Sequence, residues 1–250
     1  MQVCSAFNLP QQESWSIMVT AVFWSLEIIS TVIFIISVKK ETTWKTLGVK
    51  MIASSAFLLY ALYLTFQTGL DSSYGKCIIF SQALAWVGDF FMTYSPIKNK
   101  NQLVYGIVGG LAFLFAHGVY LYSFFLIQKR IDLFPKGLFW IIFAITILIV
   151  SCIMLSFKIS FGKLTLLVAV YVSALSLMCS GALYTAISCR LPSVFLTLGV
   201  GSILFVVSDF TLGVKIFGGK RFYNFPVRIV YISAYYIAQM LIATSIVYLA

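Results

Sequence analysis

Residues 193–217 read SVFLTLGVGSILFVVSDFTLGVKIF, an apolar run whose only charged side chains are Asp209 and Lys215. At a rise of 1.5 Å per residue, a helix of this length covers roughly 37 Å, more than the roughly 30 Å of hydrocarbon in a bilayer. The run shows no alternation of apolar and polar residues, so it predicts a transmembrane helix and not a strand of a membrane barrel.

The rest of the 250-residue chain repeats this pattern. It is 61% hydrophobic and 10% charged, with a mean hydropathy of +1.01, whereas a soluble domain carries roughly 25% charged residues. We therefore expect an all-α membrane protein, a bundle of about eight transmembrane helices that forms a single polytopic domain over residues 1–250. The expected spans are 15–38, 46–67, 77–95, 104–128, 137–157, 163–187, 193–217 and 226–250.

The basic residues predict how the chain is oriented. The net charge is +10, but Lys and Arg are spread through the short connectors and not gathered on one face, so nucleic acid is not an expected partner. Basic residues favour the cytoplasmic side. With both termini on the non-cytoplasmic side, twelve of them face the cytoplasm and five face the opposite side. The twelve are Lys39, Lys40, Lys45, Lys50, Lys98, Lys100, Lys158, Lys163, Lys215, Lys220, Arg221 and Arg228; the five are Lys76, Lys129, Arg130, Lys136 and Arg190.

Two acids inside the apolar runs are the main candidates for chemistry. Asp89 lies in VGDFFM and Asp209 lies in VSDFTL, two similar stretches in the third and seventh spans. A carboxyl group in hydrocarbon is costly unless it is neutral, paired or hydrated, so such a residue is a functional-site candidate. Both acids fall about two helical turns before the same end of the bundle, roughly 10 Å from that interface. We expect them to meet polar residues of other spans at this depth.

A weak internal repeat accompanies the two acids. Asp89 is followed in the next span by Ala116-His117, and Asp209 is followed by Ala238-Gln239. Two four-helix repeats in parallel orientation would produce this order. Chance similarity among apolar residues would produce it equally well, and both explanations stay open.

Four motifs occur in order along the chain: Gly88-Asp89, GLAFLFAHGVY at 110–120, the stretch from Gly201 through FVVSD at 205–209, and YYIAQ at 235–239. Together they resemble the motifs of the YhhN-type lysoplasmalogenase family. Lys50 is followed by Met51 where that family often has a Lys-Pro pair, and the first span, which contains Glu27, has no counterpart in the resemblance.

The resemblance implies hydrolysis of the vinyl ether bond of a lysoplasmalogen-like lysophospholipid, which yields a fatty aldehyde and a glycerophospho-head group. This reaction needs a carboxylic acid that keeps its proton near neutral pH, and burial beside a second carboxylate provides one. Asp89 and Asp209 are the expected acid pair, and His117 is the third candidate catalytic residue. The lipid and the bilayer are the expected partners, no cofactor is expected, and the oligomeric state is not predicted. The candidate substrate-binding residues are Lys50, Tyr120, Tyr171, Ser208 and Gln239.

Each of these residues also has a structural explanation. Lys50 could hold a lipid phosphate or extend to the interface, and His117 could be a neutral core histidine. Tyr and Gln side chains often join helices, and Ser208 lacks the surroundings of a nucleophile. With a single histidine and scattered cysteines, a metal site is not expected.

Two other classes of protein remain open. Asp89, Asp209 and His117 could form the proton relay of a proton-coupled transporter, which would require a polar path to both faces of the membrane. A structural membrane protein whose acids only pair is the third possibility.

Overall fold

The computed structural model describes residues 14–38, 42–97, 101–131, 137–222 and 224–250. Within these ranges the chain is helical, and eight helical spans are long and apolar enough to cross a membrane. The expected all-α bundle is confirmed, and each expected span overlaps an observed one with ends that differ by a few residues.

The spans follow one another with short connectors. The turns η2 (Gly162–Leu164) and η4 (Lys220–Phe222) lie in two of these connectors. The first six spans are α1 (Ser14–Ser37), α2 (Trp44–Thr68), α3 (Ser73–Ile97), α4 (Gln102–Arg130), α5 (Gly137–Ser156) and α6 (Thr165–Cys189). The seventh comprises α7 (Pro192–Val194), a π-helical stretch η3 (Phe195–Val200) and α8 (Gly201–Phe217), and the eighth comprises α9 (Phe225–Thr244) and α10 (Ile246–Leu249).

Local sequence signals explain where several helices begin. Thr43 caps α2, and its hydroxyl accepts from the backbone N–H of Thr46, whose hydroxyl in turn accepts from the N–H of Thr43. Asn224 caps α9 by accepting from the N–H of Val227. Such caps satisfy N–H groups that the first helical turn leaves without partners.

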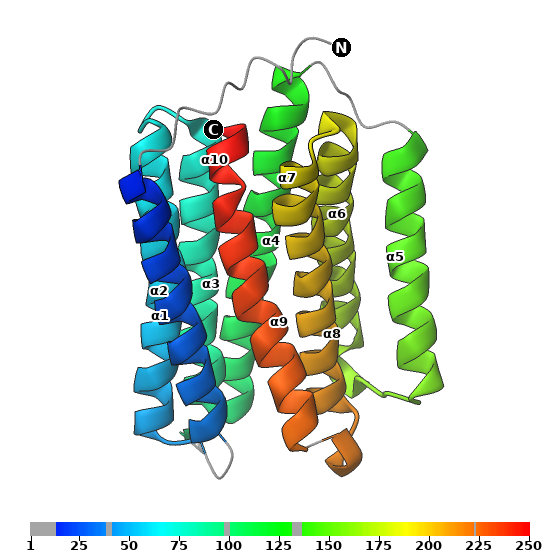
Figure 1. Cartoon of the computed structure of the whole chain (residues 1–250). Helices are drawn as coiled ribbons and strands as arrows, with labels where there is room; N and C mark the ends of the chain where they lie inside the picture. Colours follow the sequence, from blue (N-terminus) through cyan, green and yellow to red (C-terminus); the bar gives the residue numbers. More distant parts are fainter. Residues whose placement is uncertain (1–13, 39–41, 98–100, 132–136, 223) are drawn as a thin grey trace.

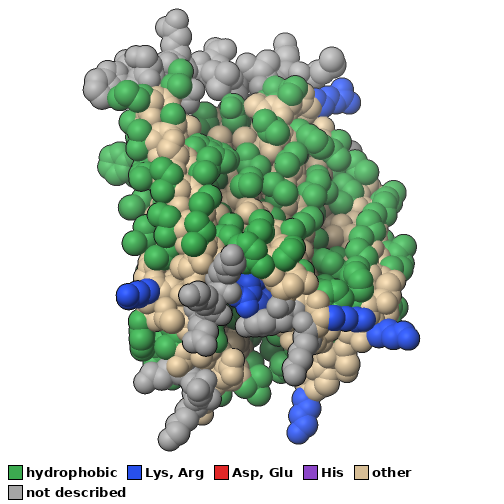
Figure 2. Space-filling view, turned by 60° about the horizontal axis from the view of Figure 1, so that its bottom comes forward, with side chains coloured by type: hydrophobic (Ala, Val, Ile, Leu, Met, Phe, Trp, Pro, Cys, Tyr) green, Lys and Arg blue, Asp and Glu red, His purple; other side chains and the backbone are tan. Residues whose placement is uncertain are grey.

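The spans alternate in direction, so the described chain starts and finishes on one side of the bundle (Figure 1). We call that side the terminal end and the opposite side, where α1 finishes and α2 begins, the basic end. Lys and Arg side chains surround the basic end in Figure 2. Five basic residues used to predict orientation, Lys39, Lys40, Lys98, Lys100 and Lys136, lie outside the described residues.

Close helix contacts fix the interior of the bundle. α3 packs along α4 and α8 packs along α9, while α9 is the most buried span and also contacts α1 and α2. A Cβ atom at Gly109 would lie 3.1 Å from the backbone oxygen of Gly88, so these two glycines let α3 and α4 approach closely. α5 lies at the edge of the bundle in Figure 1, where it packs on α6. Large apolar side chains cover the outer surface, as expected for a surface that faces lipid.

Candidate functional site

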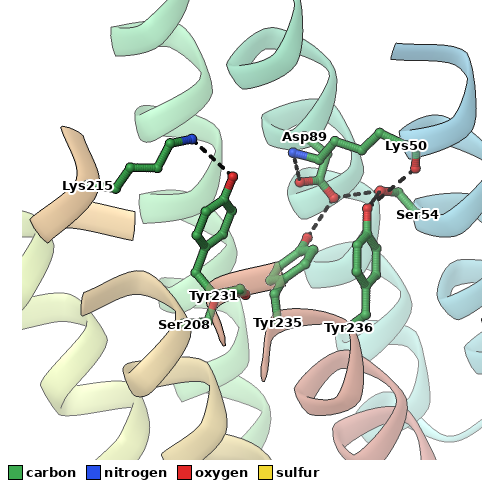
Figure 3. Close-up of polar contacts among 8 residues, drawn as sticks. All are labelled: Lys50, Ser54, Asp89, Ser208, Lys215, Tyr231, Tyr235 and Tyr236. Atoms are coloured by element: carbon green, nitrogen blue, oxygen red, sulfur yellow. Dashed lines mark hydrogen bonds and ion pairs between the residues drawn. The ribbon is translucent and has the colours of Figure 1, made fainter. Parts of the chain in front are cut away.

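Asp89 on α3 lies at the centre of a group of polar contacts near the basic end. Its side chain is 2% exposed, and its Oδ1 lies 2.8 Å from the Nζ of Lys50. Its Oδ2 accepts from the hydroxyl of Ser54 at 2.7 Å and from that of Tyr235 at 2.8 Å. Figure 3 shows these side chains from α2 and α9 converging on the carboxyl group. We call Asp89, Lys50, Ser54 and Tyr235 the Asp89 centre.

The surroundings of Asp89 fit an ionised carboxylate. Lys50 and Ser54 are four residues apart on α2 and therefore point from the same face of that helix. Together with Tyr235 they supply one ammonium group and two hydroxyl groups, all of which can donate hydrogen bonds to a carboxylate. A protonated carboxyl group has one O–H donor of its own and fewer sites that can accept such bonds. Tyr236 extends the group, since its hydroxyl lies 3.3 Å from that of Ser54.

Asp209 on α8 has different neighbours, Tyr171 and His117. We call these three residues the Asp209 centre. The hydroxyl of Tyr171 donates to its Oδ2 at 2.6 Å, and the Nε2 of His117 lies 3.2 Å from the same oxygen. His117 Nε2 is also 3.2 Å from the Tyr171 hydroxyl. No described residue donates to the other oxygen, Oδ1, of Asp209.

His117 is fully buried, and its Nδ1 has no hydrogen-bond partner among the described residues. An imidazolium would need acceptors for both N–H groups, so a neutral ring with its proton on Nε2 fits this position. The Asp209 centre therefore holds its carboxyl group with neutral donors, whereas the Asp89 centre includes a cation.

One aromatic ring contacts a residue of each centre. The centroid of Phe205 is 5.1 Å from that of His117 and 5.7 Å from that of Tyr235. Among the described contacts, the two acids share no hydrogen-bond or ion-pair partner. Each acid has one partner from the other half of the chain. His117 on α4 contacts Asp209 on α8, and Tyr235 on α9 donates to Asp89 on α3.

The remaining candidate residues bond to neighbouring helices. The hydroxyl of Tyr120 donates to Oε1 of Gln239 at 2.7 Å, which joins α4 to α9. The hydroxyl of Ser208 donates to the backbone oxygen of Tyr231 at 2.9 Å, which joins α8 to α9. These bonds satisfy the buried hydroxyl groups of Tyr120 and Ser208, whereas Nε2 of Gln239 is buried without a hydrogen-bond partner among the described residues.

More positive charge gathers between the Asp89 centre and the basic end. Lys215 on α8 donates to the hydroxyl of Tyr231 at 3.0 Å, and its charge is repelled by those of Arg228 and Lys50. Arg228 donates through Nη1 to the backbone oxygen of Val38. This end of the interior would therefore attract an anionic group.

Two cavities bear on the search for a ligand site. One, of about 130 Å³, lies between α1 and α9 and is lined by Glu27 and Tyr236, among others. The other, of about 430 Å³, lies at the terminal end, where Asp71, Tyr74 and Arg130 line it. None of the candidate site residues lines either of these two cavities. No three His, Cys, Asp or Glu side chains in the described ranges are grouped so that they could hold a metal ion.

Some of these residues were predicted from the sequence and others were not. Asp209, His117 and Tyr171 were singled out and lie together, whereas Lys50 pairs with Asp89, a partner that the sequence did not suggest. Ser54 was missed, although its spacing of four from Lys50 on one helix was a usable signal. The involvement of Tyr235 was hidden because helix rotation cannot be deduced from an apolar run.

Comparison with known proteins gives one match. The family model described as the YhhN family matches residues 41–246. That range contains both centres and leaves out α1 with Glu27. No curated protein and no solved structure matches the chain.

Proposed function

Because the chain belongs to the YhhN family, we propose that it is an intramembrane hydrolase that cleaves the vinyl ether bond of a lysoplasmalogen-like lysophospholipid. The motif resemblance suggests this reaction, and the two buried acids are groups of the kind that it needs. The observation that carries the proposal is a difference between the contacts of the two acids. The carboxyl group of Asp89 lies beside a cation and two hydroxyl donors, whereas that of Asp209 contacts one hydroxyl group and one imidazole ring.

Asp209 is proposed as the proton donor, and Asp89 as the fixed negative charge. Lys50 places a cation 2.8 Å from the carboxyl group of Asp89, and two hydroxyl groups hold its orientation. Asp209 is nearly buried, receives its hydrogen bonds at one oxygen from neutral groups, and has its other oxygen available to carry a proton. Two carboxyl groups with different surroundings are a common way to provide an acid and a carboxylate at the same pH.

The reaction would begin with transfer of a proton from Asp209 to the β-carbon of the vinyl ether. The carbon–carbon double bond is consumed, and an oxocarbenium ion forms, whose positive charge the carboxylate of Asp89 stabilises. Water then adds to the charged carbon and gives up a proton, which restores Asp209. The resulting hemiacetal breaks its bond to the glycerol oxygen and yields the aldehyde and the alcohol.

The neighbouring residues are assigned supporting roles. Tyr171 and His117 hold Asp209 in one orientation, and Lys50 sets the charge of Asp89. Tyr120, Ser208 and Gln239 are proposed to hold α4, α8 and α9 in place around the two acids through the helix contacts described above. The basic end is proposed to face the cytoplasm, in line with the excess of Lys and Arg there.

The proposed reaction can be tested by incubating the purified protein with a lysoplasmalogen in D₂O. We expect it to release aldehyde from a lysoplasmalogen and to place one deuterium on the carbon next to the aldehyde group, because that carbon receives the proton. The matched lipid with a saturated ether should give no aldehyde. Absence of aldehyde from the folded protein would contradict the proposal, and proton-driven uptake into proteoliposomes would then favour a transporter.

A further inference from the structure

Glu27 on α1 is an acid that neither centre uses. Its side chain is 3% exposed, and neither of its carboxyl oxygens has a hydrogen-bond partner among the described residues. Thr31 lies one turn further along α1, and its hydroxyl also has no hydrogen-bond partner in the described part of the chain. Leaving such groups unpaired in an apolar interior costs free energy, so this arrangement indicates a ligand or water.

Both residues line the 130 Å³ cavity between α1 and α9. Polar groups occur at Glu27, Thr31, Ser233 and Tyr236, and the other lining residues are apolar. Three apolar lining residues are well exposed on the outside of the bundle, which indicates that the cavity opens sideways toward lipid. They are Ile28, Val32 and Ile237.

The cavity also adjoins the Asp89 centre. Tyr236, one of its lining residues, lies 3.3 Å from Ser54, which donates to Asp89. Glu27 lies about three helical turns before the basic end of α1, and Asp89 about two turns before that end of α3, so the two acids sit at a similar depth.

The geometry points to a binding site for the glycerol end of a single-chain lysophospholipid, with its free glycerol hydroxyl hydrogen-bonded to Glu27. A volume of this order accommodates a group about the size of benzene, which is about the size of the glycerol unit alone. The chain would lie along the exposed apolar side chains of α1 and α9. This inference rests on the proposed function for the class of lipid, and Tyr236 links the cavity to the Asp89 centre.

Glu27 would then act as a specificity residue. A lysophospholipid has a free hydroxyl next to the ether-linked position, whereas a lipid with two chains has an ester or ether there and offers no donor. Polar groups built to bind a substrate hydroxyl discriminate strongly against an analogue that lacks it, because the protein groups are left unpaired. We expect a preference of about 10- to 100-fold, as one buried hydrogen bond would give.

Binding can be measured apart from hydrolysis. The probes are two saturated-ether lysophospholipids that carry a nitroxide near the start of the chain, one with the glycerol hydroxyl free and one with it methylated. Trp24 lines the cavity, so a bound probe should quench its fluorescence. A Trp24→Phe variant identifies the part of the signal that comes from this residue.

The parent should bind the free-hydroxyl probe about 10- to 100-fold more tightly than the methylated one. In Glu27→Met the preference should fall to about twofold or less, and thermal unfolding should occur at an equal or higher temperature, because an unpaired acid has been removed. Equal binding of the two probes by the parent, or an unchanged preference in Glu27→Met, would overturn the inference and leave water as the partner of Glu27.

Aldehyde release separates this inference from the proposed function. If aldehyde is released and the hydroxyl preference is absent, the Glu27 site is wrong and the hydrolase stands. If the preference is present and no aldehyde forms, the site stands as a lysophospholipid site and the hydrolase is wrong.

Discussion

At the scale of single residues, the ion pair between Lys50 and Asp89 is the main difference between the two acids. An ammonium group and two hydroxyl donors stabilise a carboxylate, which is why we propose the acid without such a cation, Asp209, as the proton donor. The sequence identified both acids and their depth, but not this inequality. Partners on other helices depend on helix rotation, which the apolar runs around Asp89 and Asp209 leave undetermined.

Removing the cation alone should destabilise the protein. In Lys50→Met the buried carboxylate of Asp89 loses its counter-charge, which typically costs about 3–5 kcal/mol. We expect a clearly lower unfolding temperature in detergent. The double variant Lys50→Met with Asp89→Asn should recover part of this loss, because the unpaired charge is gone. Lys45→Met, an exposed change on the same helix, is the control, and an equal effect of Lys45→Met and Lys50→Met would argue against the pair.

Tyr171 should affect the reaction more than the fold. Its hydroxyl makes the 2.6 Å bond to Asp209, so Tyr171→Phe leaves the carboxyl group less well oriented. We expect kcat for aldehyde release to fall about tenfold, which corresponds to about 1.4 kcal/mol, while the unfolding temperature changes little. Tyr122→Phe removes an exposed hydroxyl from α4 and should leave kcat unchanged. Unchanged kcat in Tyr171→Phe would remove this residue from the site.

At the scale of helices, the close approach of α3 and α4 determines the positions of Asp89 and His117 relative to each other. Gly88 precedes Asp89, and Gly109 lies about two turns before His117, so the contact between the two glycines sets where both side chains lie. The sequence predicted all eight spans within a few residues, because apolar length alone defines a membrane helix. It could not predict which helices pack together, because their outer faces are as apolar as their inner faces.

Two adjacent glycines allow a matched test of this contact. A methyl group at Gly109 would lie 2.8 Å from the side chain of Met92 and 3.1 Å from backbone atoms of Gly88 and Met92, whereas one at Gly110 meets nothing within 4 Å. We expect Gly109→Ala to destabilise the protein by about 1–3 kcal/mol through overpacking. Gly110→Ala should be neutral or slightly stabilising, and similar unfolding temperatures for the two variants would contradict the packing.

At the scale of the whole molecule, eight spans put the two ends of the described chain on the same side of the membrane. The possible duplication stays a prediction, although the crossed pairing of acids with helices from the other half would suit two related units. The side on which the termini lie also stays a prediction, since it rests on the distribution of basic residues.

Epitope tags at the two termini test both statements. In sealed vesicles of known orientation, added protease should cut both tags or neither, as an even number of spans requires. We expect cutting only when the non-cytoplasmic side faces outward. If the two tags behave differently, the eight-span arrangement is wrong; if both are cut only from the cytoplasmic side, the orientation is reversed.

The most direct test of the account is aldehyde release from a lysoplasmalogen by the purified parent and by three Asp→Asn variants. The parent should be active, and Asp209→Asn should lose at least about 100-fold in kcat because the proton donor is gone. Asp89→Asn should also lose most of its activity, since an amide cannot stabilise the cation. Asp71→Asn, at the terminal end and outside both centres, should match the parent. Full activity in Asp209→Asn would contradict the assignment of the proton donor, and an inactive, folded parent would contradict the proposed reaction.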